Sequence, residues 1–268
     1  MPPAASANPL APLERTRFLS IHWPAPWLAP YAALGQQAVH AILAGASVAQ
    51  ALNQLVARGA APNPGVRFVP QADLPPGMAY EQFILEHAQV PTRDNLHDFF
   101  NGLIWLHWPR AKRRMNQLHG AAVQAQGIQA RRGPLRDALT LLDENSALLL
   151  APPALHAALQ TRQWTRAFVE LRPLWQQARV HLFGHALLEK LVVPRKAITA
   201  HVYQPPPGLD TAADPNPDAA LVAALQAEHL ARKPFFPLPV LGVPGWCAEN
   251  ANFYFYDDSV VFRPARAA

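Results

Sequence analysis

The chain has 268 residues, of which half are hydrophobic and only 15% are charged, so the composition excludes a disordered chain and predicts a folded core. A single cysteine excludes an internal disulfide framework, and no run of about 18 apolar residues indicates a membrane span. The formal charge of +5 permits an anionic partner without requiring one. The N-terminus lacks a basic start followed by an apolar run, so we expect a cytoplasmic protein that does not associate with membranes.

The first half of the sequence is predicted to be mostly helical. Residues 1–30 are rich in proline and alanine and hold two tryptophans, which predicts an ordered, irregular arm. The expected elements that follow are two helices within 31–59, a strand at 66–70, a helix at 79–89, an apolar helix at 94–108 and a basic helix at 110–126. Ser47 is the expected N-cap of the second helix, and Thr92 or Asp94 that of the apolar helix, which Pro109 should end or kink.

The second half of the sequence contains more β-prone segments. Residues 137–151 and 253–264 each hold two apolar runs around acidic residues, which predicts two β-hairpins. The other expected elements are a short helical region at 153–172, a strand or loop that passes into a helix near Gly184, a strand at 198–204, a surface loop at 205–217 and a helix at 218–233 with Asn216 as its N-cap. We therefore predict an α+β, mainly helical fold, with an irregular arm at 1–30 and a single domain at 31–268.

One stripe of polar groups crosses the apolar helix. At 100° per residue, Asp94, His97, Asp98 and Asn101 fall within an arc of about 100°. Two interpretations stay open: the groups cap the helix and form its wet face, or they line a cleft in which His97 and Asp98 bind a metal ion. His107 lies on the apolar side of the helix, and we interpret it as a core histidine with satisfied hydrogen bonds.

A second candidate lies in the stretch HLFGHALLE, where His185 and Glu189 are four residues apart. If a helix begins at Gly184, the two side chains project together. The pair differs from the zinc-protease motif, in which two histidines share one helix. His97, Asp98, His185 and Glu189 together would offer a divalent metal ion nitrogen and oxygen ligands, which suit zinc, manganese and iron about equally.

Further residues are candidates for supporting roles. Asn101 or Asp137 would orient a metal-bound water. Arg136 is either half of a buried pair with Asp137 or an anion contact, and Arg110 is a second candidate anion contact. Arg110 also begins the densest basic run, which we interpret as a solvated helix face because it lacks the length and module of a nucleic-acid binder. The members of this run are Arg110, Lys112, Arg113 and Arg114, with Arg131 and Arg132 further on.

The remaining polar clusters have structural interpretations. Residues 143–145, Asp-Glu-Asn, are interpreted as a hairpin turn, because turns favour Asp and Asn for backbone reasons. Cys247 has no apparent histidine partner and is interpreted as structural. The sequence contains no GxSxG, P-loop, GxGxxG or EF-hand motif.

Four separated stretches resemble a bacterial family catalogued as domain of unknown function 3025. They are PTRDNLHDFFNGLIWLHWPRAK, RDALTLLDEN, LFGHALLEKL and PLPVLGVPGWCAENANFYFYDD with the later VFRP. The resemblance covers roughly residues 65–265. It implies that these motifs belong to one compact domain and suggests that their polar groups meet in space, but it brings no activity, cofactor or substrate. The family has a second tryptophan in place of Cys247, which argues against a catalytic cysteine.

Three functions remain as hypotheses. The first is a metal-assisted, hydrolase-like enzyme acting on a small-molecule or anionic ligand, with His97, Asp98, His185 and Glu189 around a divalent metal ion. The second is a non-catalytic protein that binds a small ligand, a peptide or nucleic acid, and whose polar groups form a structural network. The third and weakest is an RNA- or DNA-associated protein that uses Arg110–Arg114.

Overall fold

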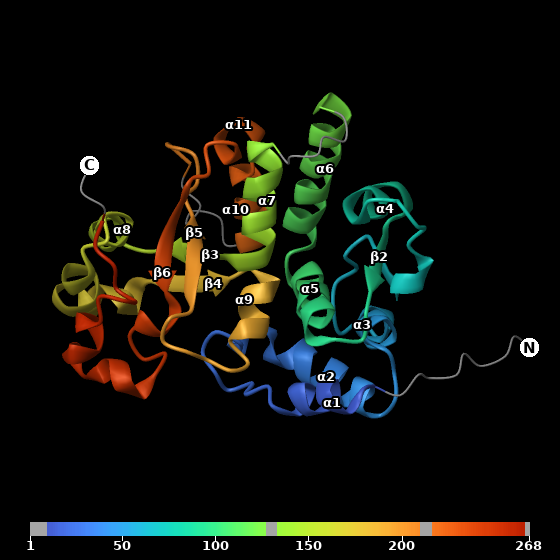
Figure 1. Ribbon diagram of the computed structural model, residues 1–268, viewed down its shortest axis with the longest axis horizontal. Coiled ribbons are helices and arrows are strands. Elements are labelled where there is room, and N and C mark those ends of the chain that lie inside the picture. Colours follow the sequence, from blue (N-terminus) through green and yellow to red (C-terminus); the bar gives the residue numbers. More distant parts are fainter. Residues whose placement is uncertain (1–9, 127–132, 210–215, 266–268) are drawn as a thin grey trace, which may run out of the picture. The chain divides into compact units, whose positions relative to one another are not determined.

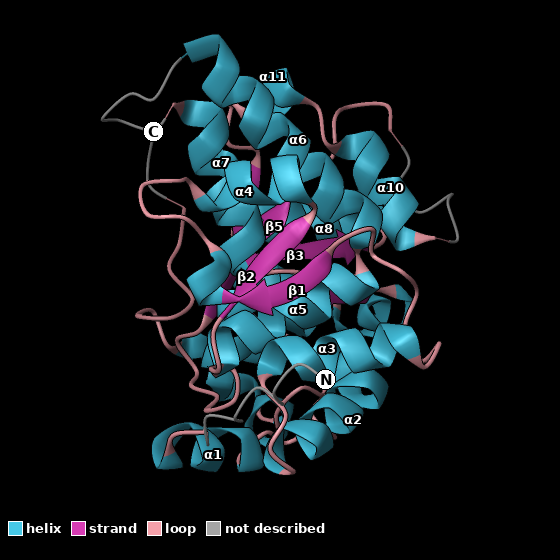
Figure 2. Cartoon of the chain, turned by 90° about the vertical axis from the view of Figure 1, so that its right-hand side faces the viewer, coloured by secondary structure: helices cyan, strands magenta, loops and turns pink. Residues whose placement is uncertain are grey.

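The structure, a computed structural model, describes residues 10–126, 133–209 and 216–265. Helices predominate and the strands are few and short, which confirms the α+β, mainly helical class (Figure 2). The contacts divide the chain into two compact units: unit 1 comprises residues 1–24 and 28–130, and unit 2 comprises residues 25–27 and 131–268. The predicted division into an arm and a single domain stays a prediction. None of the described helices is long and apolar enough to cross a membrane.

Unit 1 consists of helices and a small parallel sheet. Its described helices are α1 (Pro12–Leu19), α2 (Ala32–Leu43), α3 (Val48–Ala57), α4 (Tyr80–His87), α5 (Leu96–His107) and α6 (Pro109–Gln126). Strand β1 (Arg67–Pro70) pairs in parallel with β2 (Gln89–Thr92), and α4 lies between them in the chain. The predicted helices and the first strand are confirmed. Strand β2 has no counterpart in the prediction, and α1 lies in the stretch that was expected to be irregular.

Helix α5 is the buried centre of unit 1. Ten of its 12 residues are buried, including Asp98 and Asn101. The interpretation of these two residues as part of a wet face is therefore wrong, and each must find its partners inside the protein. Gly102 allows close packing, because a Cβ at this position would collide with the side chain of Leu52 on α3.

The first turns of α3 and α5 show which hydrogen bonds Asp94 and the backbone N–H of Asp98 make. Ser47 caps α3 as predicted, with a capping box that includes Gln50. The cap of α5 is Asn95, whose side chain accepts a hydrogen bond from the Asp98 backbone N–H at 2.8 Å. The expected caps Thr92 and Asp94 are therefore wrong. Asp94 instead accepts a hydrogen bond from the backbone N–H of Val48, in the first turn of α3, at 2.7 Å.

Unit 2 is built on a four-stranded sheet of order β4-β3-β5-β6 (Figure 1). Its described elements are α7 (Pro134–Asn145), β3 (Ser146–Leu150), α8 (Pro153–Gln160), β4 (Arg179–Leu182), α9 (His185–Lys190), β5 (Thr199–Tyr203), α10 (Pro217–Ala224), α11 (Ala227–Leu230) and β6 (Phe235–Pro239). Strand β3 is parallel to β5 and antiparallel to β4, and β5 is antiparallel to β6. The predicted strand at 198–204 and the passage from strand to helix near Gly184 are confirmed.

Both predicted hairpins are wrong. Residues 137–145 belong to α7, and the next residue, Ser146, begins β3. The buried residues of α7 are Ala138, Leu139 and Leu142, a helical spacing that puts one face of the helix into the core. At the C-terminus, residues 253–257 form a 3-10 turn in place of a strand.

The structure also differs from the prediction at two places between residues 218 and 239. The helix expected at 218–233 is divided into α10 and α11, although Asn216 caps α10 as predicted. Strand β6 has the sequence FFPLP, which does not predict a strand because proline is rare inside sheets. The predicted loop at 205–217 includes residues 210–215, which lie outside the described residues.

Aromatic packing replaces the expected C-terminal hairpin. The ring of Phe168 stacks on Tyr256 and on Trp175, with centroid distances of 5.0 and 5.5 Å. Asn250, which is 1% exposed, donates hydrogen bonds to the carbonyl oxygens of Leu241 and Val243 at 2.8 and 2.7 Å. The segment is therefore held by side chains and has no strand ladder.

Candidate functional site

The direct junction between α7 and β3 positions His185. The carbonyl oxygen of Ser146 accepts hydrogen bonds from the backbone N–H groups of Phe183 at 3.0 Å and Gly184 at 2.9 Å. These bonds hold the chain where it enters α9, of which His185 is the first residue. A Cβ at Gly184 would lie 2.5 Å from the backbone nitrogen of Asn145, so this approach requires glycine.

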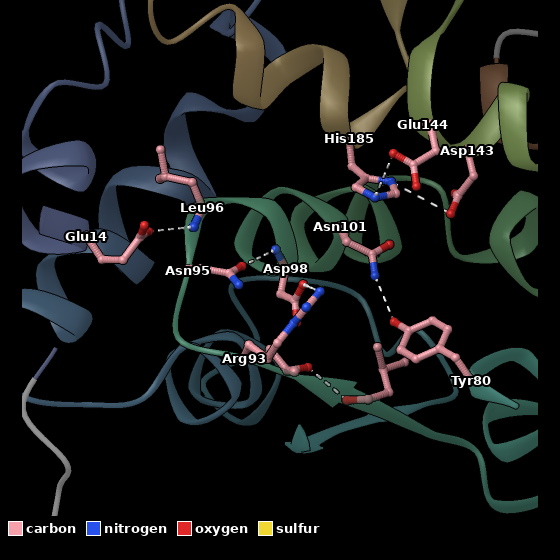
Figure 3. Close-up of polar contacts among 12 residues, drawn as sticks. Glu14, Tyr80, Arg93, Asn95, Leu96, Asp98, Asn101, Asp143, Glu144 and His185 are labelled. Carbon is pink, nitrogen blue, oxygen red and sulfur yellow. Dashed lines mark hydrogen bonds and ion pairs between the residues drawn. The ribbon is translucent and has the colours of Figure 1, made fainter. Parts of the chain in front are cut away.

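The imidazole of His185 lies between two carboxylates from the last turn of α7 (Figure 3). Its Nδ1 is 3.7 Å from Oδ2 of Asp143, and its Nε2 is 3.9 Å from Oε2 of Glu144. The histidine side chain is 5% exposed, whereas Glu144 is 42% exposed, so the cluster is reachable from the carboxylate side. We call these three residues the His185 cluster. A buried imidazole in contact with two carboxylates can bind a metal ion or carry a positive charge.

A family profile described as "Protein of unknown function (DUF3025)" matches residues 66–266. The chain belongs to this family. The match includes the whole His185 cluster, whereas helices α1 to α3 precede it. Neither the comparison with curated proteins nor that with solved structures gave a match. The resemblance seen in the sequence is thereby confirmed, and the DUF3025 region contains every predicted site residue.

Asp143 and Glu144 were missed as site residues of this DUF3025 chain. Their interpretation as turn residues is wrong, because they lie in the last turn of α7 and the chain enters a strand without a turn. The helical spacing of Ala138, Leu139 and Leu142 was the signal that could have placed them on a helix. Composition alone could not decide between a turn and a helix end, because Asp, Asn and Ser are frequent in both.

The four predicted metal ligands are divided between the two units. His97 and Asp98 belong to unit 1, and His185 and Glu189 to unit 2. The prediction that all four share one ion stays a prediction. Glu189 follows His185 by four residues on α9, as the sequence predicted.

Asp98 has a structural partner in unit 1. Its carboxylate accepts hydrogen bonds from Arg93: from the backbone N–H at 2.7 Å, from Nε at 3.1 Å and from Nη2 at 2.9 Å (Figure 3). Both carboxylate oxygens are therefore used at the start of α5. Negative charge is favourable at this position because the N-terminus of a helix carries a partial positive charge.

The two predicted water-orienting residues also have protein partners. The Asn101 side chain donates from Nδ2 to the Tyr80 hydroxyl at 2.9 Å, and its Oδ1 accepts from Lys112 Nζ at 2.8 Å. Asp137 forms an ion pair with Lys233 at 3.2 Å. At a rise of 1.5 Å per residue, Asp137 and the cluster residue Glu144 are separated by about 10 Å along α7. Catalytic roles for Asn101 and Asp137 stay predictions.

The predicted anion contacts differ in exposure. Arg110 is exposed at the start of α6. Arg136 has a buried Nε with no hydrogen-bond partner among the described residues. Of the two alternatives for Arg136, the buried pair with Asp137 is wrong: Asp137 is 43% exposed and pairs with Lys233. Their roles as anion contacts stay predictions.

The basic run does not form a continuous solvated face. Lys112 is 6% exposed, and besides its bond to Asn101 its Nζ lies 5.4 Å from the centroid of the Trp105 ring. Arg113 donates to the carbonyl oxygen of Pro64 at 3.0 Å. The interpretation of the run as a solvated face is therefore wrong at Lys112. Arg131 and Arg132 lie outside the described residues.

His107 is confirmed as a satisfied histidine of the core. Its Nδ1 lies 3.0 Å from the carbonyl oxygen of Leu103, and its Nε2 lies 2.9 Å from that of Pro30. Burial lowers the pKa of His107, although the two carbonyl contacts act in the opposite direction. His107 is thus part of the structure of unit 1 and no candidate ligand.

Proposed function

We propose that the protein is a metal-dependent, hydrolase-like enzyme whose divalent ion is held by His185 and Glu144. The observation that supports this proposal is the buried imidazole of His185, which contacts one carboxylate at each ring nitrogen. The arrangement lies within unit 2 and within the DUF3025 match.

The two carboxylates have different parts in this proposal. Metal-binding histidines commonly donate their second ring N–H to a carboxylate, which fixes the ring and raises its basicity. Asp143, at Nδ1, is the orienting carboxylate, and Glu144, near Nε2, is the second ligand. Two ligand atoms about 2.1 Å from a tetrahedral ion are roughly 3.4 Å apart. The 3.9 Å between Nε2 and Oε2 therefore needs only a small rotation of the exposed Glu144 side chain.

The donor atoms define the class of ion. Nitrogen and oxygen ligands without a thiolate suit zinc, manganese or iron. When bound, such an ion lowers the pKa of a coordinated water and polarises a carbonyl or phosphoryl bond of a substrate. Glu189, one turn after His185, is the further ligand that α9 offers. The predicted ligands His97 and Asp98 stay part of the test, with Asp98 disfavoured because Arg93 uses both of its oxygens.

The metal content of the purified full chain tests the proposal. After removal of metal with a chelator, the protein is reloaded separately with zinc, manganese and iron(II), and bound metal is measured by mass spectrometry. We expect about one ion per chain in the wild type, loss of the ion in His185→Ala and Glu144→Gln, and about tenfold to hundredfold weaker binding in Asp143→Asn. His156→Gln and Glu228→Gln, which change a histidine and an exposed glutamate elsewhere in unit 2, are the matched controls. A wild type without stoichiometric metal contradicts the proposal.

The predicted ligands outside the His185 cluster are tested in the same assay. His97→Ala, Asp98→Asn and Glu189→Gln each lower metal affinity if the residue binds the ion. The reaction class is then tested with p-nitrophenyl acetate and p-nitrophenyl phosphate, whose hydrolysis must depend on the added ion and on His185. Hydrolysis that persists in the presence of excess chelator would count against an ion-dependent enzyme.

One observation favours a second function, that of a non-catalytic binding protein with a structural polar network. The predicted site residues Asp98 and Asn101 are buried and bonded to Arg93, Tyr80 and Lys112. Buried networks of this kind can specify a fold without chemistry. Under this alternative, His185→Ala lowers the melting temperature by the same amount with and without added metal. Under the metal proposal, added metal raises the melting temperature of the wild type only.

A further inference from the structure

A hollow in unit 2 is lined, as far as the described residues go, by positively charged and neutral residues and by no acidic residue. It has a volume of about 460 Å³ and is lined by Asn145, Lys190, Arg195, Ala197, Ile198 and Thr199. The residues come from the end of α7, the end of α9 and the segment that leads into β5. We call this hollow the basic pocket. Its volume lies in the range of small-molecule binding sites, which are usually about 300–1,000 Å³.

The two cations of the basic pocket have no ion-pair partner among the described residues, unlike two other lysines of unit 2. Lys196, next to Arg195 in the chain, pairs with Asp258 at 3.0 Å and lies 4.3 Å from the centroid of the Phe255 ring. Lys233 pairs with Asp137 at 3.2 Å. Within the part of the chain that the structure describes, Lys190 and Arg195 have no such carboxylate, so two positive charges line one hollow.

The hydrogen bonds beside the pocket add no negative charge. Asn145 Nδ2 donates to the carbonyl oxygen of Thr199 at 3.0 Å and to Nδ1 of His201 at 2.9 Å. Because Nδ1 accepts a hydrogen bond, the neutral His201 ring carries its proton on Nε2. Burial and the nearby charge of Lys190 both lower the pKa of His201, so this histidine stays neutral near pH 7. The charge of the pocket is therefore that of Lys190 and Arg195.

We propose that the basic pocket binds the phosphate group of a small phosphomonoester. A guanidinium group binds two phosphate oxygens through parallel N–H bonds, and an ammonium group adds a compact charge. A phosphate group alone fills only a small part of the hollow. The apolar side chains of Ile198 and Ala197 offer a surface for the organic part of the ligand. This proposal goes beyond the metal site and does not depend on it.

The test uses the full chain and a matched pair of probes, ribose 5-phosphate and ribose. Binding is followed by NMR chemical shifts and by calorimetry at about 150 mM NaCl, where non-specific attraction between exposed charges is screened. An excess of chelator is present throughout, so that a metal ion cannot bind the phosphate. We expect saturable binding of ribose 5-phosphate with shifts at residues 190–199, and about tenfold weaker binding of ribose.

Variants assign the binding to the pocket. Lys190→Ala/Arg195→Ala should weaken ribose 5-phosphate binding by about tenfold or more. Arg232→Ala removes one exposed positive charge from unit 2 outside the pocket lining and should leave the affinity within about twofold of that of the wild type. Lys190 and Arg195 are exposed, so the variants should fold, which melting curves verify. The two single variants give the same comparison if the double variant is unstable.

Three results overturn the proposal. They are the absence of saturable binding of ribose 5-phosphate at concentrations up to about 20 mM, equal affinities in the wild type and the double variant, and a loss in Arg232→Ala as large as that in the pocket variants. Failure of the metal assay would leave these outcomes unchanged, because the chelator removes metal from every sample.

Discussion

Gly184 packs so closely on Asn145 that an added Cβ would lie 2.5 Å from the Asn145 backbone nitrogen and 2.6 Å from its Cα. Backbone atoms cannot move aside as the end of a side chain can. We expect Gly184→Ala to destabilise the protein by about 1–3 kcal/mol, the usual cost of overpacking, as measured by urea unfolding. Gly120→Ala is the control, because a Cβ there meets only the flexible Leu85 side chain and alanine favours the helix by about 1 kcal/mol. Equal stability of Gly184→Ala and the wild type would show that the contact relaxes.

The bonds between Asp98 and Arg93 predict how an Asp98 variant behaves. Asp98→Asn removes a charged acceptor of three hydrogen bonds, and since Arg93 is 57% exposed we discount the loss to about 1–2 kcal/mol. Chemical denaturation measures it, and a double-mutant cycle with Arg93→Ala isolates the pair. If Asp98 is purely structural, metal content stays at the wild-type value. Loss of metal in a folded Asp98→Asn variant would instead support Asp98 as a ligand.

Burial is the largest cause of the lowered pKa of His201, and the positive charge of Lys190 is the second. Lys190→Met should therefore raise the pKa of His201 while leaving it below the usual value of about 6.5. An NMR titration of the imidazole carbon resonance measures this shift, with Arg232→Ala as the control for a general change in charge. An unchanged pKa in Lys190→Met would show that Lys190 lies too far away to act.

Several partly buried histidines make the stability depend on pH. Burial is the largest cause of a lowered pKa at His107, His156, His181 and His201. Between each lowered pKa and the unfolded value of about 6.5, the unfolded chain binds more protons, so stability falls as the pH decreases through this range. Each histidine contributes at most about 1.4 kcal/mol per pH unit. Urea unfolding at pH 7.5 and 5.5 should show the loss, and His201→Asn should reduce it. A stability that rises on acidification contradicts this prediction.

Asn250 holds the C-terminal segment by its side chain. It is 1% exposed, and its two donated bonds satisfy the carbonyl oxygens of Leu241 and Val243. We expect Asn250→Ala to cost about 1–3 kcal/mol, because it removes two buried hydrogen bonds, although the Val243 carbonyl keeps its bond from the Trp246 N–H and the Leu241 carbonyl its bond from the Cys247 thiol. Asn252→Ala, which removes one bond to an exposed backbone N–H, should cost about 1 kcal/mol or less. Thermal unfolding of the two variants measures the difference. Equal losses of stability would show that the buried hydrogen bonds of Asn250 contribute no more than the exposed bond of Asn252.

Periodic apolar segments were predictable from the sequence. Helices α2, α3, α5 and α6 follow from hydrophobic spacing and from Ser47 and Pro109, since these signals are local. Strand β6 was not predictable, because its partner β5 lies about 35 residues earlier in the chain and tertiary pairing overrides the low strand preference of proline. The parallel pairing of β1 with β2 was not predictable either, because the two strands are separated in the chain by α4.

The candidate site was only partly predictable. The sequence identified His185 on a helix start next to Gly184, which the structure confirms. It could not identify Asp143 and Glu144 as its neighbours, because their position depends on the hydrogen bonds from residues 183 and 184 to the Ser146 carbonyl. The stripe on α5 was visible, but the partners of Asp98 and Asn101 come from other segments, so the periodicity alone could not distinguish a ligand from a buried hydrogen-bond network.

The absence of any connecting residue between α7 and β3 makes this point of the chain intolerant of changes in length. Asn145 ends the helix and Ser146 starts the strand. One inserted residue would turn the helix by about 100° relative to the sheet and carry both acidic side chains away from the imidazole, although no side chain had been replaced. Insertions in homologous chains should therefore be missing between residues 145 and 146.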